Sequence, residues 1–463
     1  MNRRSLDQTQ TPLLSTLQAC AHRSNYAAFH TPGHKRGRGA PESLQTLLGY
    51  QTLQADLPEL PELDNLFAPQ GVIQAAQELA AEAFGAEQTW FLANGSTSGV
   101  IAAILATCHP GEKIILPRNV HQSAISGLIL AGAIPVFVQP EYDPVLGIAH
   151  SITPAAVAEA LAEHPDAKAV MMVYPTYYGI GGDVAAIAHL CHQHAIPLLV
   201  DEAHGAHFAF HPQLPTPALA AGADLSVQSI HKTLSALTQA AMLHVQGNRV
   251  DRDRLTKSLA LVQSTSPNYL LLASLDGARH QMATQGRELL EQTLALADDA
   301  QCEINQIPGL STLNPAQATT PGWVTSDRTR LTVTVSGLGI NGFTADEILH
   351  QQFGVTCELP SLQHLTFIFS PGNREEDVEQ LISAFKRLAS EIKKSRYRES
   401  RFRERKDIPL PPLSSLLSPD PSRRLLCPYQ NPSPGSSSEP HQCRGGLSLS
   451  SGNSATAAGR GRY

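Results

Sequence analysis

The most informative stretches of this 463-residue chain are Leu198-Leu-Val-Asp-Glu-Ala-His-Gly205 and Ser229-Ile-His-Lys-Thr233. Each stretch places a reactive side chain, Asp201 or Lys232, next to the end of an apolar run. Apolar runs of this kind are typical of buried strands in a parallel sheet, where ligands bind at the carboxyl ends of the strands. We therefore predict one βαβ step that brings the acid and the lysine to a common edge.

Strand-like apolar runs alternate with helix-like amphipathic segments through the middle of the chain. This alternation predicts an α/β fold with a mostly parallel sheet and helices on both of its faces. The strand-like runs are residues 89–93, 113–117, 135–138, 169–174 and 197–200.

A second unit with its own apolar pattern follows the first. Residues 330–336 and 365–369 read as strands, and Asn373 with Glu376 forms a capping-box signature for a final helix. The apolar positions of that helix share one face: Val378, Leu381, Ile382, Phe385 and Leu388. We therefore predict a small α/β domain at this end of the chain.

These patterns divide the chain into four parts. We predict an N-terminal arm over residues 1–70, a large ligand-binding domain over 71–295 and the small domain over 296–394. Residues 395–463 have no periodic apolar pattern and are rich in Pro, Ser, Gly and Arg. Disorder is expected for this tail, because it offers too little apolar surface to offset the entropy of ordering.

Composition narrows the class of protein. The net charge of −7 argues against a nucleic-acid binder, so a small-molecule substrate is expected. The seven cysteines are an odd number without paired short spacings, which favours reduced thiols. Neither a signal-peptide pattern nor an apolar run of membrane-spanning length is found, so we expect a cytoplasmic protein.

The chemistry of Asp201 and Lys232 matches that required to bind pyridoxal 5'-phosphate (PLP). A carboxylate beside the ring nitrogen keeps that nitrogen protonated, so that the ring can accept electrons from a breaking bond. A lysine in apolar or cationic surroundings loses proton affinity and becomes a nucleophile for the cofactor aldehyde. The segment Asn94–Gly99, between a strand and a helix, would hold the phosphate together with Ser229 and His231.

Each of these motifs also has a simpler interpretation. Asp201 is suited to cap a helix, and the segment Asn94–Gly99 is suited to an ordinary Ser/Thr cap. The tetrad Asp201-Glu-Ala-His204 resembles the Walker B motif of an ATPase, but the phosphate-binding loop that such an enzyme needs does not occur in this sequence.

A histidine-rich segment contains residue types that bind metals, but its helical periodicity argues against a metal site. Helical spacing places Cys191 and His194 on an inner face, and His189 and His192 on an outer face. The four side chains cannot converge on one ion, so no metal site is expected.

Eight motifs together resemble the prokaryotic ornithine/lysine/arginine decarboxylases, in their short form without the N-terminal receiver-like wing. The motifs occur in the family's order: His30-Thr-Pro-Gly-His-Lys35, Leu63-Asp-Asn-Leu66, Asn94-Gly-Ser-Thr-Ser98, Pro117-Arg-Asn-Val-His-Gln-Ser123, Pro140-Glu-Tyr-Asp-Pro144, Asp201-Glu-Ala-His-Gly-Ala-His207, Ser229-Ile-His-Lys232 and Ser264-Thr-Ser-Pro267. The resemblance implies a fold type I PLP enzyme, similar to aspartate aminotransferase. It also implies a homodimer, or an assembly of dimers, with the active site at the interface.

The resemblance assigns roles to nine residues. Lys232 would carry the cofactor, Asp201 would contact the ring nitrogen, His121 and Ala203 would lie against the two ring faces, and His204 would line the site. Ser96, Thr97, Ser229 and His231 match phosphate-binding positions. The implied activity is that of a carboxy-lyase, which releases CO₂ and a polyamine-type amine from arginine, lysine or ornithine.

Several points stay open on the sequence alone. A catalytically impaired PLP-binding relative, or another fold type I enzyme such as an aminotransferase or lyase, is an alternative to the decarboxylase. Nothing in the sequence separates a guanidinium from an ammonium substrate. The acidic residues Asp56, Glu59, Glu62 and Asp64 form either a solvated loop or a substrate contact in the partner subunit's pocket.

Overall fold

The computed structural model describes residues 5–394, and its main feature is a seven-stranded sheet in the order β1-β10-β9-β8-β6-β2-β3. The strands are β1 (Gln88–Leu92), β2 (Lys113–Pro117), β3 (Ile134–Val138), β6 (Ala169–Val173), β8 (Leu198–Asp201), β9 (Leu225–Gln228) and β10 (Ala241–Val245). β3, β2, β6, β8 and β9 are parallel to one another, whereas β10 is antiparallel to both β9 and β1. The predicted mostly parallel sheet is confirmed.

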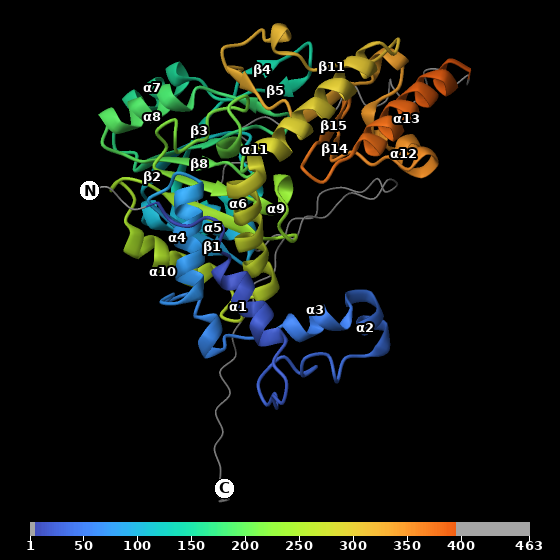
Figure 1. The fold of residues 1–463 in the computed structure, drawn as a ribbon. Helices are drawn as coiled ribbons and strands as arrows, with labels where there is room; N and C mark the ends of the chain where they lie inside the picture. Colours follow the sequence, from blue (N-terminus) through green and yellow to red (C-terminus); the bar gives the residue numbers. More distant parts are fainter. Residues whose placement is uncertain (1–4, 395–463) are drawn as a thin grey trace, which may run out of the picture. The chain divides into compact units, whose positions relative to one another are not determined.

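Successive side chains of each strand enter different apolar cores, one on each face of the sheet. In β1, Phe91 belongs to one core, whereas Trp90 and Leu92 belong to the other. The first core includes residues of α4 (Val72–Ala83), α7 (Pro154–Glu163), α8 (Val184–Gln193) and α11 (Tyr269–Asn305). The second includes residues of α5 (Gly95–Thr107), α6 (Gln122–Ala131) and α10 (Arg252–Val262). Helices therefore cover both faces, as the sequence predicts (Figure 1).

A smaller antiparallel sheet follows, in the order β11-β13-β15-β14. Its strands are β11 (Ser311–Thr312), β13 (Arg330–Thr334), β14 (Leu359–Pro360) and β15 (His364–Ile368). They share a third apolar core with α12 (Gly342–Phe353), α13 (Glu375–Lys394) and the end of α11. Since α11 runs without a break through residue 296, the division into domains at this position stays a prediction.

The start of α13 differs from the capping box that the sequence predicts. The Asn373 side chain accepts a hydrogen bond from the Ser370 N–H at 3.0 Å. Asp377, rather than Glu376, reaches back along the chain and accepts from the Arg374 N–H at 3.0 Å. The predicted apolar face is present, with Ile382 only half-buried. The predicted tail over 395–463 lies outside the described residues.

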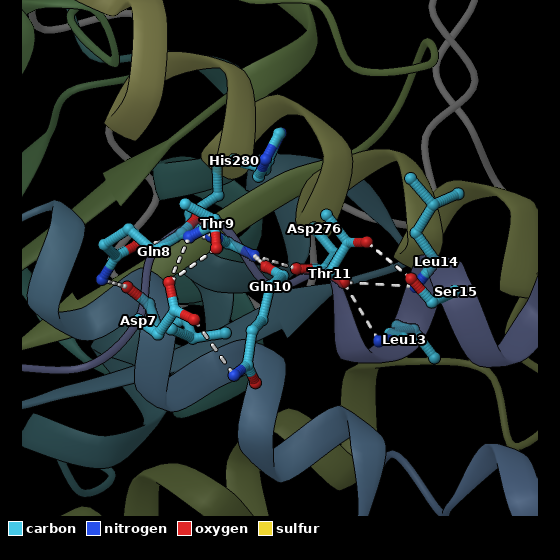
Figure 2. Close-up of polar contacts among 12 residues, drawn as sticks. Asp7, Gln8, Thr9, Gln10, Thr11, Leu13, Leu14, Ser15, Asp276 and His280 are labelled. Atoms are coloured by element: carbon cyan, nitrogen blue, oxygen red, sulfur yellow. Dashed lines mark hydrogen bonds and ion pairs between the residues drawn. The ribbon is translucent and has the colours of Figure 1, made fainter.

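The N-terminal arm contains α1 (Pro12–Ala21), α2 (Glu42–Leu48) and α3 (Tyr50–Ala55), and its first part is anchored on α11. The Asp276 carboxylate accepts from the N–H groups of Leu13 and Leu14 at 3.0 and 3.2 Å, at the start of α1 (Figure 2). The Arg279 guanidinium donates to Asp276 at 2.5 Å and to the carbonyl of Gln10 at 2.6 Å. Both charged side chains are fully buried, so the arm is held by a desolvated ion pair.

We predict that Arg279→Met lowers the free energy of unfolding by about 3 kcal/mol, because it leaves the Asp276 carboxylate buried without its cation. Urea denaturation measures this loss, and limited proteolysis should cut the chain faster near residues 7–15. Arg287→Met is the matched control, because Arg287 is an exposed arginine of the same helix. Equal stability of the two variants would contradict an anchoring role for the pair.

None of the helices in the part of the chain that the structure describes combines the length and apolar character needed to cross a membrane.

Candidate active site

Asp201 and Lys232 meet at the carboxyl edge of the main sheet. Asp201 is the last residue of β8, and Lys232 lies in α9 (Ile230–Thr233), directly after β9. β8 and β9 are parallel neighbours in which Asp201 pairs with Val227, so both strands deliver their next residues to one edge. A cavity of about 250 Å³ opens there. Six of the nine predicted site residues line it: Ser96, His121, Asp201, Ala203, His204 and Lys232.

The Lys232 amine is half-buried in this cavity. Its Nζ lies 3.0 Å from Nε2 of His204 and 5.9 Å from the centre of the Tyr177 ring. Burial lowers the pKa of Lys232, the positive charge of Arg330 lowers it further, and the carboxylates of Asp201 and Glu358 oppose this shift. A lysine whose pKa is lowered holds more of its amine in the nucleophilic form.

Asp201 is a buried carboxylate without a cationic partner in direct contact among the described residues. One oxygen accepts from the Ala203 N–H at 3.3 Å. Burial raises the pKa of Asp201, and the nearby charges of Lys232 and His121 only partly offset that effect. A buried acid that lines a cavity and is destabilised in its charged form suits a ligand with a protonated ring nitrogen.

A place for an anion lies at the start of α5. No side chain of the described residues caps this helix, so its first N–H groups are left for another acceptor. The Ser229 hydroxyl donates to the Ser96 hydroxyl at 2.7 Å, which brings the starts of α9 and α5 together. The other three predicted residues do not line the cavity: Thr97 in α5, His231 in α9, and Ser229, which directly precedes α9.

His121 is held in place by the helix that it begins. Its Nδ1 accepts a hydrogen bond from the Ser123 N–H at 3.2 Å and so caps α6. This bond holds the imidazole ring at the start of the helix. His121 and Ala203 both line the cavity. Together with the lysine, the acid and the uncapped helix, they suit a flat ligand that carries an aldehyde, a basic ring nitrogen and a phosphate. PLP fits that description.

Glu202 has a structural role, which argues against the ATPase interpretation of the Asp-Glu-Ala-His tetrad. Its side chain is fully buried and accepts from the Ser226 hydroxyl at 2.6 Å, Gln228 Nε2 at 2.9 Å and the Ala218 N–H at 2.8 Å. Burial raises the pKa of Glu202 to about 7. The side chain therefore ties the end of β8 to β9 and does not reach the cavity.

The histidine-rich helix α8 differs in one detail from the sequence prediction. His194 is exposed rather than on the inner face, whereas His192 is half-buried and bonds to Asp224 at 2.9 Å. The helix ends at Gln193, so helical periodicity no longer applies at His194. Among the described residues, no group of three His, Cys, Asp or Glu side chains is arranged to hold a metal ion.

The acidic stretch of the arm has partners within its own chain. Asp64 accepts from the N–H groups of Gly71 at 2.7 Å and Ile73 at 3.1 Å, and so holds the start of α4. Asp56 bonds to His34 at 3.0 Å, and Glu62 pairs with Arg23 at 2.9 Å. Glu59 accepts from Asn65 at 3.0 Å. These contacts favour a structural role for the stretch.

Sequence reasoning missed three residues near Lys232. Tyr177 lines the cavity and donates from its hydroxyl to Glu358 at 3.0 Å. Arg330, at the start of β13, is buried and lies 3.1 Å from Nδ1 of His204. A signal for Arg330 did exist, because a charged residue inside an otherwise apolar and threonine-rich strand has to be compensated when it is buried.

Comparisons with known proteins identify the family to which this sequence is similar. The family described as "Orn/Lys/Arg decarboxylase, major domain" matches residues 11–377. "Arginine decarboxylase" of Bacillus subtilis is 40% identical over 387 residues, which are 84% of this chain and 79% of that protein. "Arginine decarboxylase" of Halalkalibacterium halodurans is 43% identical over 382 residues, covering 82% of this chain and 78% of that protein.

Solved structures support the fold. Lysine decarboxylase A from Pseudomonas aeruginosa has a TM-score of 0.73 at 24% identity, over 82% of this chain. The constitutive lysine decarboxylase of Escherichia coli has a TM-score of 0.71 at 21% identity, over 83% of this chain. This chain spans only about 60% of the lysine decarboxylase chains that it matches. An alanine–glyoxylate aminotransferase from Nostoc, with a TM-score of 0.55, extends the likeness beyond decarboxylases.

Proposed function

This chain belongs to the Orn/Lys/Arg decarboxylase family, and we propose that it binds PLP through Lys232 and decarboxylates arginine. Family membership makes it a carboxy-lyase that acts on a basic amino acid; the cofactor, the site residues and the choice of arginine are the proposal. The observation that carries it is the half-buried Lys232 amine, which shares one cavity with the buried Asp201 carboxylate.

When bound, PLP accepts the electron pair that the breaking bond between Cα and the carboxylate releases. The chain's own residues prepare the site for that chemistry. Lys232 offers an amine with lowered proton affinity, and Asp201 offers a buried carboxylate that keeps a ring nitrogen protonated. His121 and Ala203 would lie against the two faces of the ring.

The phosphate would be held at the start of α5, where Ser96, Thr97 and Ser229 offer hydroxyls beside free helix N–H groups. His231 would act from α9. His204 would line the site beside the reacting amine of Lys232, with which it already makes contact.

The choice of arginine rests on the relatives that are about 40% identical over most of their length and carry the name arginine decarboxylase. We propose Glu358 as the acceptor for the guanidinium. It bonds to Tyr177, whose ring lies 5.9 Å from the Lys232 amine, and its charge affects the pKa of both Lys232 and Arg330. The carboxylate is exposed and free to accept a further donor.

A panel of substrates tests the function. Purified protein with added PLP is incubated with arginine, lysine and ornithine, while CO₂ and the product amines are measured. We expect the highest kcat/KM for arginine. Lysine or ornithine as the preferred substrate would contradict the choice of arginine, and PLP binding without any CO₂ release would support the impaired-enzyme alternative. Transfer of the amino group to a keto acid would indicate an aminotransferase.

Glu358→Gln should raise KM for arginine by roughly 10- to 100-fold with a smaller change in kcat, because it removes one charge-assisted hydrogen bond. Initial rates across arginine concentrations measure the effect. Glu347→Gln is the control, since Glu347 is an exposed acid on the neighbouring α12. An unchanged KM in Glu358→Gln would mean that another group binds the guanidinium. The acidic stretch of the arm would then be the next candidate.

We also propose a homodimer, or an assembly of dimers, in the cytoplasm. The arm exposes large apolar side chains that a partner would cover, including Phe29, at 94% exposure, and Leu47, at 78%. The five cysteines within the described residues are free, which fits a reducing compartment. Sedimentation of the purified protein tests the dimer.

A further inference from the structure

Three side chains form a line that leads from the small sheet into the cavity: Arg330, His204 and Lys232. We infer that Arg330 fixes the proton of His204 on Nε2, and that this proton holds Lys232 as an uncharged amine that accepts a hydrogen bond. The inference deepens the proposed role of Lys232 and rests on it. Arg330 does not contact Lys232 in this arrangement, so it is a positioning residue.

The first step concerns Arg330. Arg330 is only 6% exposed as a residue, and one terminal nitrogen of its guanidinium lies 3.1 Å from Nδ1 of His204. A guanidinium donates hydrogen bonds and has no acceptor atom. The contact therefore requires Nδ1 of His204 to be the acceptor, which means that Nδ1 carries no proton.

The position of Arg330 is fixed by the chain beside it. Gly179 has a φ of +77°, and a Cβ at this residue would lie 2.6 Å from Cβ of Arg330. The stem of the arginine thus packs directly against the glycine backbone. Within the described residues, Nε and one terminal nitrogen of Arg330 have no hydrogen-bond partner. The other terminal nitrogen bonds to His204.

The second step concerns His204, which is buried and neutral. Burial holds the pKa of His204 well below its usual value, and the positive charge of Arg330 pushes it in the same direction. A neutral imidazole has one N–H and one acceptor nitrogen. Since Nδ1 is the acceptor, the proton is on Nε2.

The third step concerns Lys232. The Nε2–H of His204 points at an Nζ that lies 3.0 Å away. An ammonium has three donors and no lone pair, so a protonated Lys232 would place two donors against each other. Only the free amine accepts this hydrogen bond, and the free amine is the form that attacks an aldehyde.

The other charged and titratable groups around Lys232 do not share one sign. Asp201 and Glu358 favour the ammonium, whereas Arg330 and burial favour the free amine. Three further titratable groups lie near the amine. His121 caps α6 and Tyr177 lies in the loop after β6, and both line the cavity, whereas His231 is the neighbour of Lys232 in α9. Charge alone therefore does not decide the state of Lys232, and the directed N–H of His204 favours the free amine.

Trace acetylation measures this state without any turnover. The cofactor-free protein is treated with a small amount of acetic anhydride over a range of pH, and the labelled fraction of Lys232 is quantified by mass spectrometry. We expect a midpoint below that of the exposed Lys257. Arg330→Met should raise the Lys232 midpoint by about one pH unit, a tenfold change in free amine at a given pH. Arg328→Met, at an exposed arginine two residues earlier, should leave it unchanged.

The His204→Phe background shows whether Arg330 affects Lys232 through His204 or directly through its own positive charge. If Arg330 acts through His204, Arg330→Met should shift the midpoint by less than half as much in His204→Phe as in the wild type. Equal shifts in the two backgrounds, or no shift in either, would overturn the inference. Thermal melting of each variant shows that the comparison is made on folded protein.

A second measurement needs no change at Arg330. The ¹⁵N chemical shifts of the His204 ring in the wild type, assigned by their loss in His204→Phe, show which nitrogen carries the proton. We expect the proton on Nε2, and a proton on Nδ1 would overturn the inference. Neither experiment depends on decarboxylation, so a failure here is distinguishable from a failure of the proposed function.

Discussion

Lys232→Ala should abolish decarboxylation, with a loss on the order of 10⁴-fold or more in kcat, as expected when the nucleophile of a covalent mechanism is removed. The variant should still fold, because the lysine lines a cavity and is not part of an apolar core. It should also lose the visible absorbance that a covalent link between PLP and a lysine gives. CO₂ release, the absorbance spectrum and borohydride trapping followed by peptide mapping measure the three effects.

The control is Lys257→Ala, which removes an exposed lysine of α10 and should behave as the wild type in all three measurements. If the visible band persists in Lys232→Ala and borohydride traps the cofactor on another lysine, Lys232 is not the residue that carries PLP. Addition of a small primary amine extends the test, since an external amine can restore part of the activity only if the missing group is an amine at the reacting atom.

Much of the main sheet follows from the sequence, and the reason is its burial. Strands covered on both faces are continuous apolar runs, and the five predicted runs lie within one residue of β1, β2, β3, β6 and β8. β10 shows the limit of this signal. Its apolar residues indicate burial but carry no information on direction, and the strand runs antiparallel to both neighbours.

Sequence patterns likewise predict one part of the candidate site and miss another. Asp201 ends β8 and Lys232 follows β9, and these two strands pair in the sheet, so local patterns predict that the two residues lie close together. Arg330 and Glu358 belong to the small sheet and its loops, more than a hundred positions beyond Asp201, and no local pattern predicts where that sheet packs. The predicted helical face of His194 was wrong for a related reason, because the helix ends one residue earlier.

Asp201→Ala should cost about 4 kcal/mol of transition-state stabilisation, or on the order of 10³-fold in kcat, while the visible absorbance of the bound cofactor persists. If Asp201 is the partner of the ring nitrogen, its removal takes away the carboxylate that keeps this nitrogen protonated, and an unprotonated ring is a poor acceptor of electrons. Single-turnover CO₂ release measures the loss separately from substrate binding. Asp253→Ala, at an exposed acid of α10, is the control.

A cofactor analogue with carbon in place of the ring nitrogen decides whether Asp201 acts through that atom. The wild type loaded with the analogue should lose about as much activity as Asp201→Ala does with PLP, because both changes remove the protonated nitrogen. The two changes made together should then be no worse than either one, since they interrupt the same interaction. Losses that multiply would mean that Asp201 contributes by another route, such as holding the Ala203 backbone to which it bonds.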